Sequence, residues 1–89
     1  MPDMSVLVSL IGKPGCHLCD DAKVVIDDVL TRVPDIDVEY ASLEDNPLWH
    51  ELYGDLIPVV LIDGVEHSHW RVDAESLEKE LLEKVAQDA

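Results

Sequence analysis

The sequence has few of the features that mark secreted, membrane-spanning or nucleic-acid-binding proteins. It contains no phenylalanine, only two cysteines, and six basic residues against 20 acidic ones, which gives a formal net charge of −14. No apolar run approaches the roughly 20 residues that a membrane helix needs, and the N-terminus lacks the basic region that begins a secretory signal. The lack of both features predicts a cytoplasmic protein. Because so acidic a chain repels nucleic acid and anionic membranes, we expect it to bind neither.

What the sequence does contain indicates one small globular domain. Apolar residues make up 47% of its 89 residues, which argues against disorder, and we find no repeat, linker or low-complexity segment. We therefore expect a single domain over residues 1–89, large enough for one hydrophobic core. The acidic residues are spread along the whole chain. They either keep a small protein soluble or attract a partner with a basic surface.

The two cysteines are spaced Cys16-x-x-Cys19, between a strand-like apolar run over residues 4–11 and a helical pattern over residues 17–32. In a cytoplasmic protein this spacing indicates redox or metal chemistry rather than a structural disulfide. A thiol at the start of a helix meets unpaired backbone N–H groups and the positive end of the helix dipole, which favour the reactive thiolate. The position of the pair therefore predicts redox chemistry.

Hydrophobic periodicity predicts alternating strands and helices along the rest of the chain. In chain order we expect a strand over 4–11, a helix over 17–32, a half-buried or edge strand over 36–41, a short helix capped by Asn46, a buried strand over 57–62, a hairpin turn at Asp63-Gly64, a strand over 65–69 and a helix capped by Asp73. The first helix has an apolar stripe of Leu18, Ala22, Val25, Ile26, Val29 and Val33. This β-α-β-α-β-β-α order predicts an α/β fold whose first two strands are parallel.

This order of elements is similar to the thioredoxin fold in its minimal, glutaredoxin-like form. The motifs that support the resemblance are Lys13-Pro14-Gly15-Cys16-x-x-Cys19, Ile57-Pro58-Val59 and Ile62-Asp63-Gly64. The resemblance implies a four-stranded mixed sheet with helices on both faces. It also implies a cis peptide bond before Pro58, which would face the cysteines.

The chain departs from typical glutaredoxins at the positions that hold glutathione. His17-Leu18 replaces the usual Pro-Tyr between the cysteines, and Ile11 replaces an aromatic residue. Residues 67–73 lack the glycine pair that precedes the acidic residue which binds the glutathione α-amino group. The Cys-His-Leu-Cys motif and the Trp70-Arg71-Val72-Asp73 segment resemble a bacterial branch of glutaredoxin-like proteins more closely than a glutathione-using enzyme.

The resemblance implies a thiol–disulfide oxidoreductase of cell redox homeostasis in which Cys16 is the nucleophile and Cys19 resolves the mixed disulfide. The residues expected to bind substrate are Lys13, His17, Ile57, Pro58 and Trp70. Lys13 and a protonated His17 would favour the thiolate, whereas Asp20 would oppose it. The expected partners are protein disulfides or low-molecular-weight thiols and a reductase of unknown identity. We expect a monomer without a bound cofactor, reduced by glutathione or another thiol.

Three alternatives use the same residues differently. Cys16 and Cys19 could join His67 and His69, which would share one face of a strand, in a tetrahedral zinc site. An iron–sulfur cluster could bridge two subunits through Cys16 and external thiols. The chain could also be a non-catalytic interaction module whose cysteines are inert and whose acidic surface binds a partner.

Overall fold

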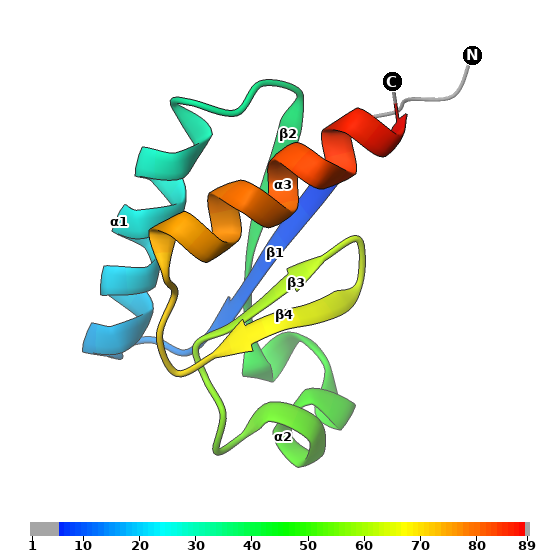
Figure 1. The fold of residues 1–89 in the computed structure, drawn as a ribbon. Helices are drawn as coiled ribbons and strands as arrows, with labels where there is room; N and C mark the ends of the chain where they lie inside the picture. Colours follow the sequence, from blue (N-terminus) through cyan, green and yellow to red (C-terminus); the bar gives the residue numbers. More distant parts are fainter. Residues whose placement is uncertain (1–5, 89) are drawn as a thin grey trace.

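A computed structural model describes residues 6–88 and shows a four-stranded mixed sheet in the strand order β2-β1-β3-β4 (Figure 1). The elements are β1 (Val6–Gly12), α1 (His17–Leu30), β2 (Ile36–Ser42), the 3₁₀ helix η1 (Leu43–Asp45), α2 (Pro47–Tyr53), β3 (Val59–Ile62), β4 (Val65–His69) and α3 (Ala74–Asp88). This confirms the expected α/β, thioredoxin-like fold. The start of the first predicted strand, residues 4 and 5, lies outside the described residues.

The sequence predicts the direction of two of the three strand pairings, the parallel pair of the first two strands and the antiparallel hairpin, and both are confirmed. β1 is parallel to β2 and antiparallel to β3, and β3 is antiparallel to β4. β1 lies inside the sheet with nearly all its residues buried, whereas β2 is an edge strand and half-buried. At the predicted hairpin, Asp63 and Gly64 have φ angles of 51° and 84°, the left-handed conformation that a tight two-residue turn requires. The hairpin is therefore confirmed.

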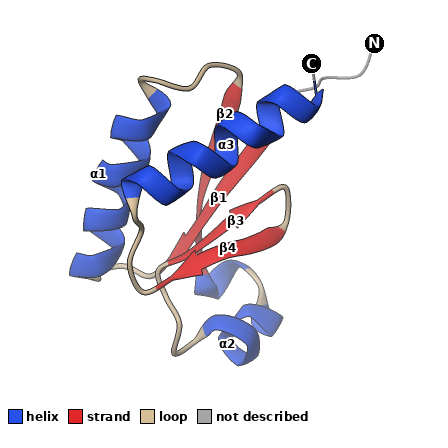
Figure 2. Ribbon diagram, in the orientation of Figure 1, coloured by secondary structure: helices blue, strands red, loops and turns tan. Residues whose placement is uncertain are grey.

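Helices cover both faces of the sheet (Figure 2). On one face, α1 and α3 pack on β1 and β3 around Ile26 and Leu77, which are fully buried. On the other face, η1 and α2 pack on Ile11, Val59 and Leu61. Burial of these apolar side chains is the main source of stability in a domain of this size. Within residues 6–88, none of the helices has the length and apolar content to cross a membrane.

Several element boundaries and one helix face differ from the prediction. α1 ends at Leu30 rather than at residue 32, since the Thr31 and Arg32 N–H groups bond to carbonyls three residues back, as in a tightened last turn. Leu18 was expected in the buried stripe, but 46% of it is exposed. Cys19 occupies the buried position of the first turn, because the stripe continues from Cys19 through Ala22 and Ile26 at steps of three and four residues.

The second half of the chain holds two further differences. β3 begins at Val59, two residues later than predicted, and Pro58 has no N–H for the ladder. The helix η1 was not predicted, although Ser42 and Asp45 form a capping box at its start, with Asp45 Oδ2 accepting the Ser42 N–H at 2.9 Å. The predicted Asn46 cap is confirmed, since its side chain accepts the Leu48 N–H at 3.0 Å.

Candidate redox site at the start of helix α1

Cys16 is the N-cap residue of α1. Its backbone is extended, with φ −93° and ψ 112°, and its Sγ accepts the Cys19 backbone N–H at 3.2 Å. The first N–H groups of a helix have no carbonyl acceptor within the helix, and the Cys16 sulfur supplies one for the Cys19 N–H. The Cys16 side chain is half-buried, so it is packed against the fold and still reachable from solvent. Among the described residues both cysteines are free thiols.

Cys19 lies behind Cys16 and is buried, with 8% of the residue exposed. Burial raises the pKa of the Cys19 thiol from 9.0 to about 11, and the neighbouring Cys16 and the Asp20 carboxylate add to the rise. The Lys13 backbone N–H opposes it in part. Cys19 is therefore a neutral thiol at physiological pH. The pair is asymmetric, with one accessible sulfur at the helix cap and one protonated sulfur beneath it.

The raised pKa of Cys19 predicts a loss of stability in alkali. The unfolded chain loses this proton near the ordinary value of 9.0, whereas the folded chain keeps it to about 11. The protonated Cys19 thiol therefore contributes its full stabilisation below pH 9.0. This contribution is lost as the pH rises to about 11, which lowers the free energy of unfolding by about 2–3 kcal/mol. Urea unfolding of the reduced protein across this range measures the loss. Cys19→Ser should lose less stability over the same range, and an equal loss in both proteins would contradict the assignment.

Gly12 gives Cys19 the space that it occupies. A Cβ atom at Gly12 would lie 2.8 Å from Cys19 Sγ and 3.1 Å from Cys19 Cβ, closer than packed atoms of this kind approach. The last residue of β1 therefore has to be glycine for the buried sulfur to sit against the strand. This contact ties the position of the second thiol to the end of the central strand.

Pro58 and Trp70, both predicted to bind substrate, are brought together by the fold. The Ile57–Pro58 peptide bond is cis, as the resemblance implied. The Trp70 backbone N–H donates to the Pro58 carbonyl at 2.9 Å and to the Leu56 carbonyl at 3.1 Å, and its indole N–H donates to the Asp55 carbonyl at 2.8 Å. Trp70 has a φ of 67° and is 54% exposed. Three hydrogen bonds thus fix an exposed tryptophan.

Trp70 also lies near the start of α1. A hollow of about 300 Å³ separates the two and is lined by Leu18, Asp21, Ala22, Val25, Trp70, Arg71 and Val72. Ile57 packs instead with the apolar cluster under α2. His17, the first residue of α1, is exposed beside Cys16. The fold therefore places His17 and Trp70 at the same end of α1. Ile57 does not line this hollow, and only the next residue, Pro58, is bonded to Trp70.

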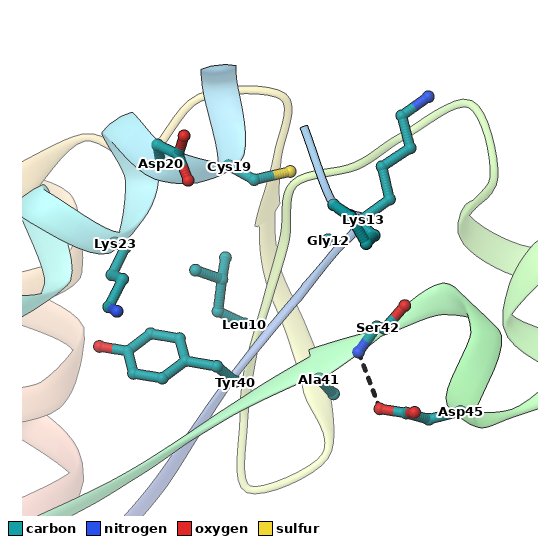
Figure 3. A pocket seen from close by; sticks show the side chains of 11 residues that line it. Leu10, Gly12, Lys13, Cys19, Asp20, Lys23, Tyr40, Ala41, Ser42 and Asp45 are labelled. Atoms are coloured by element: carbon teal, nitrogen blue, oxygen red, sulfur yellow. Dashed lines mark hydrogen bonds between the residues drawn. The ribbon is translucent and has the colours of Figure 1, made fainter. Parts of the chain in front are cut away.

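A second pocket, of about 330 Å³, opens beside Cys19 (Figure 3). Its lining includes Lys13, the one predicted substrate-binding residue that borders it. Asp20, expected to oppose the thiolate, lines it as well. The remaining polar residues of this pocket, which were not predicted, are Lys23, Tyr40, Ser42 and Asp45. Two signals were present: Lys23 lies one turn after Cys19 on the same helix face, and Ser42-x-x-Asp45 has the spacing of a capping box. Tyr40 had no such signal, because it belongs to β2, and only the pairing of β2 with β1 in the folded sheet brings it near α1.

Tyr40 contacts two side chains of opposite charge. Its hydroxyl donates to Asp27 Oδ1 at 2.7 Å, and the Lys23 Nζ lies 4.9 Å from the centre of its ring. Burial, together with the adjacent Asp27 carboxylate, raises the pKa of Tyr40 to about 12. The phenol therefore stays neutral, and its ring face is available to a cation.

The zinc ligand set considered above is not assembled. A bulge opposite Val60 and Leu61 interrupts the alternation of β4, so the expected shared face of His67 and His69 is wrong. His69 Nδ1 lies 2.9 Å from Glu66 Oε2 and its ring contacts Trp70, whereas His67 lines a pocket with residues of α3. Across residues 6–88, no group of three or more His, Cys, Asp or Glu side chains is placed to hold a metal ion.

Comparison with known proteins identifies the family. The glutaredoxin-like domain (DUF836) matches residues 7–82, so the chain belongs to this family. An uncharacterised protein of Mycobacterium tuberculosis (strain ATCC 25618 / H37Rv) is 33% identical over 78 residues, which cover 83% of this chain and 80% of that protein. A thioredoxin of Methanocaldococcus jannaschii is 34% identical over 61 residues, covering 66% of this chain and 72% of the relative.

Solved structures agree with the fold. The solution structure of protein Ne2328 from Nitrosomonas europaea superimposes with a TM-score of 0.75 at 22% identity, over 86% of this chain and 92% of that one. The crystal structure of a chloroplastic thioredoxin z gives a TM-score of 0.73 at 15% identity, over 92% and 80% of the two chains. At these identities the likeness shows a thioredoxin-like architecture and nothing more specific.

Proposed function

We propose that this member of the glutaredoxin-like family is a thiol–disulfide oxidoreductase that works through Cys16 and Cys19. The observation that supports this most directly is the asymmetry of the two sulfurs. Cys16 caps α1 and accepts the Cys19 N–H at 3.2 Å, while Cys19 is buried behind it with a raised pKa. An accessible first thiol and a protonated second thiol suit attack followed by resolution.

The reaction takes place in two exchanges. The Cys16 thiolate attacks one sulfur of a substrate disulfide, forming a mixed disulfide and releasing the other sulfur as a thiol after it takes a proton from water. Cys19 then loses its proton to water and attacks the Cys16 sulfur, so that the bond from Cys16 to the substrate breaks and a Cys16–Cys19 disulfide forms. The second half of the substrate leaves as a thiol once it takes a proton from water. The substrate thus gains two electrons and two protons: the protein supplies both electrons and the Cys19 proton, and water supplies the second proton because Cys16 starts as a thiolate.

Cys16 and Cys19 are close enough for the second exchange. Residues three apart on a helix have Cβ atoms about 5–6 Å from one another, and a disulfide needs about 3.5–4.5 Å. A small rotation at the cap residue, whose backbone is extended rather than helical, makes up the difference.

We also propose the protein's substrates, its reductant and its place of action. Its substrates are protein disulfides or low-molecular-weight thiols, bound near Lys13, His17, Pro58 and Trp70. The dithiol is the only redox group, and glutathione or another thiol, or a reductase that uses the Cys16–Cys19 disulfide as its substrate, restores the reduced form. We propose that the protein acts as a monomer in the cytoplasm.

Equilibration in glutathione redox buffers tests this function. We expect one two-electron transition to an intramolecular disulfide, with a midpoint of about −200 to −270 mV, the range of glutaredoxins and thioredoxins. Alkylation of the remaining thiols followed by mass spectrometry measures it. The protein unfolded in guanidinium is the control, because there the fold no longer sets the two thiols apart. A folded protein that forms only glutathione adducts, or remains fully reduced, would contradict the proposal.

A further inference from the structure

The pocket beside Cys19 holds an unusual share of the positive charge of this acidic protein. Two of the six basic residues, Lys13 and Lys23, line it, although the chain carries a formal net charge of −14. Figure 3 shows the Lys13 side chain extending away from the pocket, whereas the Lys23 ammonium is directed toward the Tyr40 ring. Lys23 is therefore the cation inside the pocket.

Lys23 is held in place without an ion pair. Its Nζ lies 4.9 Å from the centre of the Tyr40 ring, an arrangement that attracts the cation to the ring face. The ring is itself fixed, because the Tyr40 hydroxyl bonds to Asp27 Oδ1 at 2.7 Å. In the part of the chain that the structure describes, Lys23 forms no salt bridge. Its positive charge is thus oriented but not neutralised by direct contact.

Two carboxylates also line the pocket. Asp45 is engaged, since its Oδ2 accepts the Ser42 N–H at 2.9 Å. Asp20 follows Cys19 on α1 and faces solvent. A ligand with one carboxylate can pair with Lys23, while a second negative group near Asp20 would be repelled. The pocket therefore suits a small molecule with a single carboxylate on the part that enters it.

We propose that this pocket binds the carboxylate of a low-molecular-weight thiol or disulfide substrate, with Lys23 as the residue that sets this preference. The inference rests on the proposed function, because the ligand sulfur is the one that exchanges with Cys16. Lys23 lies one helical turn after Cys19, roughly 6 Å further along the axis. Cys16 does not itself line the pocket, and it lies seven residues before Lys23, roughly 10 Å along the axis. A thiol acid held at the cap of α1 therefore has to extend past Cys19, which does line the pocket, to bring its carboxylate to Lys23.

Three small disulfides that differ mainly in charge test the proposal: hydroxyethyl disulfide, which is neutral, dithiodipropionate, with a carboxylate on each half, and cystamine, with an ammonium on each half. Lys23→Gln should raise the KM for dithiodipropionate by about threefold to fivefold, as expected for one exposed ion pair, and leave kcat unchanged. The KM for hydroxyethyl disulfide should not change, and that for cystamine should fall.

Lys84→Gln is the matched control, because it removes the same charge from α3, where Lys84 lines a different pocket. If both variants change the three KM values equally, the effect comes from net charge and the subsite is wrong. An unchanged KM for dithiodipropionate in Lys23→Gln also overturns it. Failure of the unaltered protein to reduce any of the three disulfides would instead contradict the oxidoreductase function.

The subsite also has a readout that needs no turnover. Dithiodipropionate can be titrated into a protein that carries both Cys16→Ser and Cys19→Ser and therefore has no thiol to react with it, with NMR chemical shifts reporting the residues affected. We expect shifts at Lys23 and Tyr40, and weaker binding by the same threefold to fivefold factor when Lys23→Gln is added. Shifts that avoid these residues would overturn the subsite whatever the enzyme activity.

Discussion

Cys16→Ser is expected to lower the rate of reduction of hydroxyethyl disulfide by about 1,000-fold or more. A serine hydroxyl at the cap can still accept the Cys19 N–H that Cys16 Sγ accepts at 3.2 Å, so α1 should keep its start. The hydroxyl is not a nucleophile toward a disulfide, however, and no other described thiol is accessible, because Cys19 is buried and protonated. Thiol release from the substrate, followed over time, measures the rate.

Cys19→Ser is the matched variant, since it removes the same atom one turn further along. The first exchange at Cys16 should proceed and the second should not, so a mixed disulfide between Cys16 and the substrate should accumulate, with the mass of the protein plus one half of the substrate. If Cys16→Ser keeps the activity, the nucleophile is misassigned and the non-catalytic interaction module becomes the better account. If neither variant accumulates an adduct, the two-step route is wrong.

Gly12→Ala is expected to destabilise the protein by about 1–3 kcal/mol, the usual cost of overpacking a buried position. The new Cβ would lie 2.8 Å from Cys19 Sγ, so either the end of β1 or the first turn of α1 has to shift. Because the two cysteines lie at the first turn of α1, against the end of β1, such a shift would displace them. The rate of disulfide reduction should therefore fall together with the stability. Urea unfolding of the reduced protein measures the free energy of unfolding.

A double-mutant cycle identifies Cys19 as the group that Gly12 accommodates. In a Cys19→Ala background the sulfur is gone, and the cost of Gly12→Ala should fall to less than half, because only the contact with Cβ at 3.1 Å remains. Gly15→Ala serves as a second comparison: Gly15 has a φ of 76° but no atom within 4 Å of an added Cβ, so its cost reflects backbone strain and should not change in the Cys19→Ala background. An unchanged cost of Gly12→Ala in that background would mean that the glycine is needed for another reason.

Most of the fold follows from patterns that are local in the sequence. The alternation of residues 36–41, the Asp63-Gly64 turn and the Asn46 cap all depend on interactions between residues a few positions apart. The predictions were wrong where contacts between residues far apart in the sequence determine which side chain is buried. Leu18 fits the helical period of the apolar stripe as well as Cys19 does, and only the packing of α1 against β1 exposes the first and buries the second.

The candidate site divides in the same way. By itself, the sequence determined that Cys16 and Cys19 stand at the start of a helix after a buried strand, since a strand, a loop and a helix are each encoded by neighbouring residues. Only the tertiary structure decided how other segments are arranged: Trp70 bonded to Pro58, His67 beside α3 and His69 against Trp70, and Lys23 over Tyr40 beside Cys19. These placements join segments far apart in the chain, and their contacts form only when the sheet and both helical layers have packed.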